Sequence, residues 1–288
     1  MWWGFQLEFK QSLRTKKLWV ILGIMALLYI PVFYIMKSMG AQDFTVEAAM
    51  TFLIQFVTGM AGFFIGILAL LMGATAINSE IEKGTLRVAM SKPIKRLSYI
   101  GGKFLAHAVV LFIALLLSTL IGVLGVVYLG VPLSGQLVTD VLLLNMLLLL
   151  AMLQLVALGY ILSTLIKSSS SALGAALVLV FVLFLIMPNI VGYLVFKEMM
   201  DNPDMSMSDV KQLQKDYTTK YLFYVPTSQV GVITGDVGTT IDEGAGNPEY
   251  RGMAYAISHN LVNFGIIVGM TLLYLIVGFY RFSRMDLR

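Results

Sequence analysis

Side chains that could carry chemistry are scarce in this sequence. There is no cysteine, and the only two histidines are His107 and His259. Neither has an ionisable neighbour in the sequence, and they fall toward opposite faces of the predicted membrane, so we do not expect them to share a site. A nucleophilic or metal-dependent enzyme would need serine with histidine, paired aspartates, or histidine with glutamate at helical spacing. We therefore predict no catalytic residue in this chain.

The dipeptide Gly102-Lys103 is also found in phosphate-binding loops, but the rest of that motif is missing. Position 97 is Leu97, where the motif requires its first glycine, and position 104 is Phe104, where a serine or threonine would hold Mg²⁺. The chain is therefore not expected to bind a nucleotide cofactor or to hydrolyse ATP itself.

A cluster of methionines is the only candidate for a metal site that the sequence offers. The stretch MMDNPDMSM contains Met199, Met200, Met205 and Met207. Thioethers are soft ligands that suit Cu(I). Methionine is also a flexible hydrophobic residue that suits an interfacial or partner-binding helix. Because the chain has 18 methionines, the second interpretation is favoured and the metal site is a weak candidate.

The composition indicates an integral membrane protein. Of the 288 residues 58% are hydrophobic and only 12% are charged, which is too little charge to solvate a globule of this size. Lipid-exposed backbone must satisfy its own hydrogen bonds, so the long apolar runs are predicted to be helices. Six runs reach bilayer length: Leu18–Met36, Thr51–Ile77, Ile100–Leu129, Val141–Leu165, Ala172–Phe196 and Leu261–Phe282.

The predicted spans hold almost no ionisable groups, which disfavours a transporter driven by protons because a proton relay needs such groups. Five polar residues of the spans are expected to hydrogen-bond between helices; they are Gln55, Asn145, Gln154, Tyr160 and Asn263. Pro188 lies inside the fifth span, where it removes a backbone hydrogen bond, and Asn189 is placed to cover a freed group. Two interpretations of Pro188 stay open at this stage: a functional hinge that lines a substrate path, and a simple packing kink.

Basic residues are concentrated on one side of the predicted membrane. Fourteen of the 20 basic residues fall on the side that holds residues 1–17, residues 77–103, Lys167 and the C-terminal tail, against only four acids. Loops rich in Lys and Arg stay in the cytoplasm, so both termini are predicted to be cytoplasmic in a multi-pass protein of the cell membrane. This sidedness explains the net charge of +4, and nucleic acid is not an expected partner.

Two segments outside the spans are predicted to carry helices. Residues 1–17 place Trp2, Phe5, Phe9 and Leu13 on one helical stripe, which favours an amphipathic helix at the membrane surface over a flexible basic tail. The long extracytoplasmic segment 197–259 is predicted to contain a helix that begins after an N-cap at Ser208. Nothing indicates a second soluble domain, so residues 1–288 are predicted to form one transmembrane domain.

The polar stretch from Ile77 to Lys103 is enclosed between two spans. Its pattern predicts a short helix from Ser79 to Met90 across the inner face of the membrane, and Pro93 is expected to end that helix.

Within this stretch the run Glu80-Ile81-Glu82-Lys83-Gly84-Thr85-Leu86 is followed by Ser91-Lys92-Pro93-Ile94-Lys95-Arg96 and then Gly102-Lys103. It resembles the loop after the second span in permease subunits of ATP-binding-cassette (ABC) exporters of the type-2 permease family. The resemblance extends over the whole chain in architecture: an amphipathic N-terminal helix, six spans, and a larger outer segment before the last span.

The resemblance implies an all-α membrane domain whose residues 78–99, here called the coupling segment, dock into a separate cytoplasmic ATPase subunit. ATP and Mg²⁺ would be bound by that partner. Two ATPases and two permeases, the second a copy or a paralogue, would form the unit. The coupling residues implied are Glu80, Glu82, Gly84, Thr85, Leu86, Arg87, Pro93 and Arg96, with the charged side chains at the interface. The pathway would lie between the two permeases, and its translocation surface is predicted on the inner faces of the second and fifth spans, around Phe56, Met60, Phe63 and Pro188.

Two alternatives to an exporter permease stay open at this stage. In the first, the chain transmits mechanical work to an extracytoplasmic partner bound by its outer segment, for example in metal-site maturation. In the second, the chain is an ATP-independent channel or a membrane enzyme.

Overall fold

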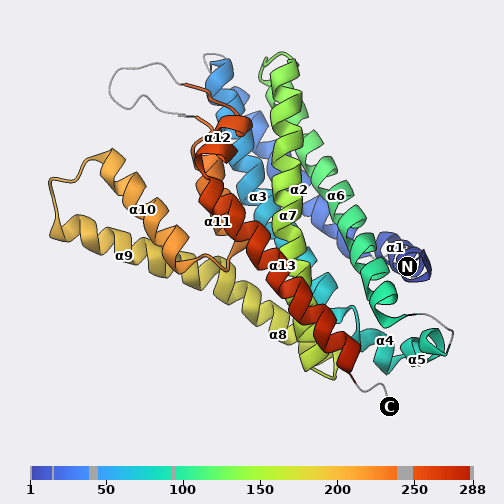
Figure 1. The fold of residues 1–288 in the computed structure, drawn as a ribbon. Coiled ribbons are helices and arrows are strands. Elements are labelled where there is room, and N and C mark those ends of the chain that lie inside the picture. Colours follow the sequence, from blue (N-terminus) through green and yellow to red (C-terminus); the bar gives the residue numbers. More distant parts are fainter. Residues whose placement is uncertain (1, 15, 39–44, 92–94, 239–248, 286–288) are drawn as a thin grey trace.

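The computed structural model describes residues 2–14, 16–38, 45–91, 95–238 and 249–285. These residues are mainly helical (Figure 1). The helices are α1 (Trp2–Arg14), α2 (Lys16–Ser38), α3 (Val46–Thr75), α4 (Asn78–Glu82), α5 (Thr85–Met90), α6 (Arg96–Tyr128), α7 (Gly135–Leu165), α8 (Ser169–Phe181), the π-helix η2 (Val182–Ile186), α9 (Met187–Asp201), α10 (Met207–Tyr221), α11 (Pro226–Gly235), α12 (Met253–His259) and α13 (Leu261–Arg284).

The six predicted membrane spans are confirmed within the described residues. The helical runs long and apolar enough to cross a bilayer are Leu18–Ser38, Val46–Glu82, Arg96–Tyr128, Gly135–Leu165, Ser169–Asp201 and Leu261–Arg284. The predicted N-terminal helix is also present as α1. The observed runs are longer than the predicted ones because several helices continue beyond their apolar stretch into polar residues.

The centre of the bundle is the pair α3 and α7, which pack more extensively than any other two helices (Figure 1). Small residues bring the two backbones together, as is usual between membrane helices. A Cβ atom added to Gly159 would lie 2.6 Å from the backbone nitrogen of Ala74, so only glycine fits there. Helices α2 and α6 pack on one side of this pair and α13 packs against α7.

The N-terminal helix α1 packs along α6. Phe5 and Phe9, from the predicted apolar stripe, stack with ring centroids 5.5 Å apart. Glu8 and Ser12 are buried although both are polar. At the far end of the chain, Arg96 Nη1 donates to the backbone oxygen of Met285 over 2.8 Å. The end of α13 therefore lies beside the start of α6, at the same end of the bundle as α4 and α5 (Figure 1).

The fifth span leaves the bundle at an angle (Figure 1), and only 22% of its apolar stretch is buried, against 61% for the span that contains α3. The run of α8 and α9 is interrupted by the π-helix η2, which ends just before Pro188. Proline has no N–H to donate to the preceding turn, which accounts for the irregular hydrogen bonding. Asn189 Nδ2 donates to the backbone oxygen of Leu185 over 2.6 Å. The predicted disruption is confirmed. The Asn189 amide bonds to the carbonyl four residues before Asn189 itself, so its covering of a group freed by Pro188 stays a prediction.

Outside residues 239–248, the segment between the fifth and sixth spans holds the three helices α10, α11 and α12. Helix α10 folds back against α9, so the two form a hairpin beside the bundle (Figure 1). Its N-cap is Ser206 and not the predicted Ser208, because Ser206 and Asp209 form a reciprocal capping box. The hydrogen bond from the Ser206 hydroxyl lowers the pKa of the Asp209 carboxyl.

The short helix α11 packs between α3, α7 and α13 and is fixed by buried amides. Gln229 Nε2 donates to the backbone oxygens of Thr218 and Leu222, and Asn263 Nδ2 donates to Gln229 Oε1. Helices α10, α11 and α13 are thereby joined by hydrogen bonds that have little competition from water.

Three of the five polar residues predicted to bond between helices do so. Asn145 accepts from the Thr119 hydroxyl, and Tyr160 and Asn263 bond to neighbouring helices as well. Gln154 instead donates to the backbone oxygen of Tyr224, which lies in the loop between α10 and α11. Gln55 is exposed and lines a surface crevice.

Candidate functional site

The coupling segment contains two short helices, α4 and α5, joined at Gly84. Gly84 has a φ of 70°, a left-handed conformation that side chains with a Cβ rarely adopt. This turn replaces the single predicted helix of residues 79–90. Leu86 is 1% exposed and fixes α5 against the bundle. On the opposite face, Arg87 is exposed and Val88 is 67% exposed.

Glu80 does not lie on that exposed face, contrary to the prediction that it is an interface charge. Its side chain is buried, 6% of the residue being exposed. One carboxylate oxygen is 2.7 Å from Lys103 Nζ, and the other accepts from the Tyr99 hydroxyl over 2.9 Å. Glu80 therefore holds α4 against α6, and a change at Glu80 would disturb the fold before it disturbed a partner surface.

Lys103 is the centre of a buried polar cluster, here called the Lys103 cluster, made of Glu8, Glu80, Tyr99, Lys103 and His107. The ammonium group lies 2.8 Å from Glu8 Oε2 and 2.7 Å from Glu80 Oε1, and donates to the backbone oxygen of Ala76 over 2.7 Å. Its three protons thus have three acceptors from α1, the start of α4 and the end of α3. The cluster joins the N-terminal helix to the coupling segment.

His107 has an ionisable partner that the sequence did not reveal. Its Nε2 lies 2.8 Å from Glu8 Oε1, and its Nδ1 lies 3.1 Å from the Tyr160 hydroxyl. Burial by itself raises the pKa of the Glu8 carboxyl, but the charges and hydrogen bonds of Lys103 and His107 outweigh it and hold that pKa well below its ordinary value. Glu8 is therefore a carboxylate at neutral pH.

Glu82 connects the coupling segment to the fifth span. Its Oε1 accepts from the backbone N–H of Ser169 over 2.7 Å. Ser169 is the first residue of α8, whose N-cap is Ser168, so the carboxylate caps a free donor at the positive end of the helix dipole. Glu80 and Glu82 are two positions apart and therefore point to different sides of α4, one to α6 and the other to α8.

A third attachment comes from α7. The hydroxyl of Ser163 accepts from the backbone N–H groups of Ile77 and Asn78, over 3.0 and 3.1 Å. These are first-turn donors of α4 that have no partner within the helix. Arg96 bonds to the end of α13, as described above, and is only half-exposed. Pro93 lies outside the described residues.

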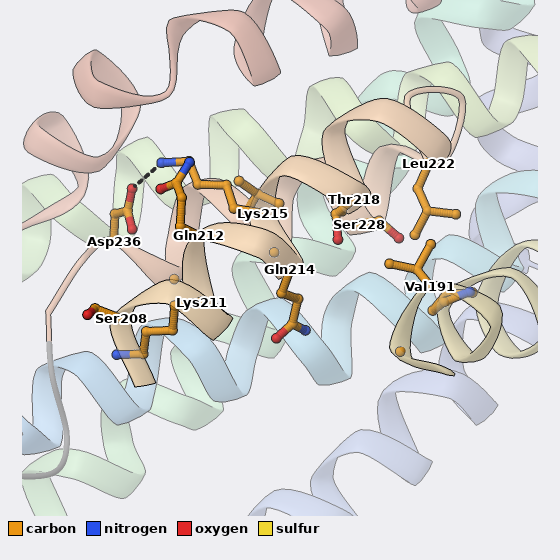
Figure 2. Close-up of a pocket in the computed structure, with 15 residues that line it drawn as sticks. Val191, Ser208, Lys211, Gln212, Gln214, Lys215, Thr218, Leu222, Ser228 and Asp236 are labelled. Carbon is orange, nitrogen blue, oxygen red and sulfur yellow. Dashed lines mark hydrogen bonds and ion pairs between the residues drawn. The ribbon is translucent and has the colours of Figure 1, made fainter. Parts of the chain in front are cut away.

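Two adjoining hollows lie between the fifth span and the rest of the molecule. The first, here called the hairpin cavity, is about 550 Å³ and lies between α9, α10 and α11 (Figure 2). The second, here called the crevice, is about 380 Å³ and lies between α3, α11 and the η2–α9 junction. Four residues line both and join them: Pro188, Ser228, Gly231 and Gly235.

The predicted translocation residues separate into two groups. Phe63 and Pro188 line the crevice. Phe56 instead packs against Tyr29 and Phe33, with ring centroids 4.8 and 5.9 Å apart, on the side of α3 that faces α2. Met60 packs half-buried against the core and does not line the crevice. Of the four predicted residues, the structure thus brings only Phe63 and Pro188 together at the crevice.

Comparison with known sequences decides the family. The profile of the ABC-2 family transporter proteins matches residues 2–287, nearly the whole chain. This chain belongs to the ABC-2 transporter family. It is a multi-pass membrane protein and the non-catalytic membrane component of an ABC transporter, a class that associates with ATPase subunits. The alternative of an ATP-independent channel or a membrane enzyme receives no support from this match.

Two relatives of this chain have the same protein name. A protein of Stutzerimonas stutzeri described as probable ABC transporter permease protein NosY is 28% identical over 208 residues, covering 69% of this chain and 72% of that protein. A protein of Pseudomonas aeruginosa with the same description is 29% identical over 187 residues, covering 62% of this chain and 64% of that protein. Both are permease subunits by name.

The methionine cluster lies on the turn of the α9–α10 hairpin. Met199, Met200 and Met207 are 38%, 66% and 75% exposed, and Met205 is half-buried. Among the residues that the structure describes, no group of three or more histidine, cysteine, aspartate or glutamate side chains is placed to hold a metal ion. The copper site on these methionines stays a weak prediction.

Proposed function

We propose that this chain is the permease subunit of an ATP-driven exporter, powered by a separate cytoplasmic ATPase that docks on the coupling segment. The single observation that carries the proposal is how this segment is built. One face of α5 presents Arg87 and Val88 to the outside, while the other face and α4 are tied to the bundle through Leu86, Glu80 and Glu82.

An ATPase that pushes on α5 acts on a rigid body. The Lys103 cluster fixes α4 to α1 and α6 by short contacts in a buried setting, where charged hydrogen bonds are strong and poorly screened. Movement of the coupling segment is therefore transmitted to α1 and α6 with little internal rearrangement. Arg87 and Val88 supply the charged and apolar contacts that a docking partner needs.

Glu82 transmits the same movement to the fifth span as well. Its bond to the first amide of α8 connects the coupling segment to the run that contains η2 and Pro188. That run has, with the sixth span, the lowest buried share of the six spans, and it lines both hollows. In this proposal, ATP binding tilts the fifth span about the η2–Pro188 interruption and so opens or closes the path that runs past Phe63.

The remaining parts of the transporter follow from this assignment. ATP and Mg²⁺ bind to the partner ATPase, present in two copies, and a second permease, identical or paralogous, completes the path. Substrate moves outward by alternating access. The end of the bundle with α4, α5 and both chain termini faces the cytoplasm, in agreement with its excess of Lys and Arg, and the protein lies in the cell membrane.

Co-purification with the cognate ATPase tests this proposal. Arg87→Glu and Val88→Glu place a repulsive or desolvated charge on the exposed face of α5 and should abolish capture of the ATPase, while the protein still inserts and unfolds as wild type does. Lys220→Glu makes the same charge reversal on exposed α10 and should leave capture unchanged. Capture at the wild-type level by both α5 variants would overturn the proposal.

A second candidate is the mechanical transmitter that acts on an extracytoplasmic partner. The α9–α10 hairpin favours it, because it stands beside the bundle with large exposed side chains at its turn, among them Met200 and Met207 (Figure 1). The purified permease–ATPase complex discriminates the two functions. An ATPase rate that rises only when an extracytoplasmic protein is added supports the transmitter, and a rate independent of such a protein supports the exporter.

A further inference from the structure

The crevice is lined by no charged side chain among the residues that the structure describes. Its hydrogen-bonding side chains are all uncharged, namely the amide of Gln55 and the hydroxyls of Thr58, Thr227, Ser228 and Thr234. A charged ligand there would lose water without meeting an opposite charge, which costs free energy. The lining therefore favours an uncharged occupant.

Two of these hydroxyls are already engaged within their own helices. Thr58 donates to the backbone oxygen of Ile54 over 2.7 Å, and Thr234 donates to that of Val230 over 3.1 Å. Both threonines therefore present mainly their methyl groups to the crevice.

The other three polar side chains of the lining have no hydrogen-bond partner within the described residues: Gln55, Thr227 and Ser228. Gln55 lies in the span Val46–Glu82, and α11, which carries the two hydroxyls, packs against α3 of that span. A polar group without a partner at membrane depth costs free energy, and a lipid acyl chain cannot supply the partner. A ligand with its own hydrogen-bond donors and acceptors can.

These partnerless groups lie at two levels of the crevice. Thr227 is at the level of Gly62, because a Cβ atom added to Gly62 would lie 3.7 Å from the methyl group of Thr227. Gln55 comes seven residues before Gly62 on α3, which is about 10 Å along the helix axis. Gly59 keeps the space between the two levels open, since a Cβ atom added there meets no atom within 4 Å. A ligand that reaches both levels is therefore elongated and polar at both ends.

Beside Thr227 the crevice has an aromatic wall. Phe63 of α3 and Phe184 of η2 line it, with ring centroids 5.9 Å apart and ring planes inclined by 49°. Phe184 packs tightly on α3, because a Cβ atom added to Gly66 would lie 2.9 Å from its Cζ. Rings arranged in this way pack favourably against the face or edge of a further ring. This level of the crevice therefore suits an aromatic ring that carries a hydroxyl group.

From these observations we propose that the crevice is a binding site for an uncharged, elongated molecule with an apolar body and a hydrogen-bonding group at each end. The Gln55 amide binds one end, and the hydroxyls of Thr227 and Ser228 bind the other. The proposal rests on the proposed function, because it names the substrate class of the path that runs past Phe63. The crevice lies within one chain, so its occupation requires neither ATP nor the ATPase.

The test uses the absence of cysteine from the chain. Gly235→Cys introduces a single thiol into the lining of the crevice, at a position where a Cβ atom meets no atom within 4 Å. Its reaction with a maleimide is followed with the protein in phosphatidylcholine nanodiscs. Four probes are compared: p-hydroxyphenylbutanamide, p-hydroxyphenylbutanoate, p-hydroxyphenylbutylammonium and phenylbutanamide. The first is uncharged and polar at both ends, and it should protect the thiol at the lowest concentration.

Variants of this thiol-bearing chain assign the two ends separately. Gln55→Leu should raise the half-protecting concentration of p-hydroxyphenylbutanamide about fivefold, because it removes the hydrogen bonds to the amide. Gln136→Leu, at an exposed glutamine of α7 outside the crevice, should not. Thr227→Val should reduce the advantage of the hydroxylated amide over phenylbutanamide, whereas Thr139→Val on α7 should preserve it. Each comparison keeps the probes the same, so their partitioning into the bilayer cancels.

A charge placed at Gln55 should change the specificity. Gln55→Lys should lower the half-protecting concentration of the carboxylate probe about tenfold and raise that of the ammonium probe. Equal effects of Gln55→Leu and Gln136→Leu would overturn the site, as would a charged probe that protects the Gln55 chain as well as the amide does. Absence of protection by all four probes would show that the crevice holds only water or lipid. Because no ATPase is present, these outcomes are distinct from a failure of ATPase docking.

Discussion

Replacing Lys103 by methionine should release α1 from the bundle. The substitution keeps the length of the side chain and removes the ammonium group that lies 2.8 Å from Glu8 and 2.7 Å from Glu80. Lys103 is 2% exposed, so its charge is shielded from bulk water in the folded protein. Removing one partner of a buried ion pair costs about 3–5 kcal/mol, which is a factor of about 100 to 1,000 or more in the docking equilibrium.

A single thiol on α1 measures this release. Ser12 faces the bundle and is 7% exposed, and Ser12→Cys changes its size little in a chain that has no other thiol. Maleimide should label this thiol slowly in the parent protein. With Lys103→Met added, the labelling rate should rise by about 100-fold or more, because labelling follows the opened fraction of α1.

Neutralising the two acids provides the control. In the variant that combines Lys103→Met with Glu8→Gln and Glu80→Gln, no uncompensated charge is left in the cluster, and labelling should return most of the way to the parent rate. Unchanged labelling in Lys103→Met, or labelling of the combined variant as fast as that of the single one, would show that the charge of Lys103 does not hold α1 in place.

Three further predictions concern the same bundle. Pro188→Ala restores a backbone N–H, so residues 182–186 should become α-helical and exchange their amide hydrogens more slowly; unchanged exchange would show that the proline does not cause η2. The pKa of the Glu8 carboxyl is held below its ordinary 4.5, so the stability it contributes is present above that value and is lost as pH falls. The unfolding temperature should be flat between about pH 8 and pH 5 and fall below that range, and Glu8→Gln should remove part of the fall, whereas an identical fall in that variant would speak against it. Gly159→Val should prevent correct insertion, because its Cβ would lie 2.6 Å from the backbone nitrogen of Ala74, and normal yield of folded protein would contradict that close contact.

The spans could be predicted from the sequence because their signals are local. A bilayer-length apolar run forms a helix because the bilayer offers its backbone no other hydrogen-bond partners. A proline inside such a run, here Pro188, disrupts the helix because it has no N–H to donate. Helix α11 gave no such signal. It has 10 residues, too few to cross a bilayer, and it is held among the spans by buried amides such as Gln229.

Pairings between distant parts of the chain could not be predicted in this way. Glu8 and His107 are 99 positions apart and meet only because α1 packs along α6. Glu80 and Glu82 look equivalent in the sequence, yet one is buried beside Lys103 and the other caps α8. Only the packing around α4 decides which carboxylate points inward. A carboxylate such as Glu8 on the packed side of an amphipathic helix is the signal that could have indicated a buried partner.

In the function proposed above, ATP bound by a partner moves the fifth span through the coupling segment. Spin labels at exposed Ser91, beyond α5, and exposed Gln214, on α10, report the distance between these parts in the permease–ATPase complex. ATP should shift this distance in the wild-type protein. Glu82→Ala, which removes the bond to Ser169, should retain the ATPase and lose the shift. An active complex whose distance is the same with and without ATP would contradict the account.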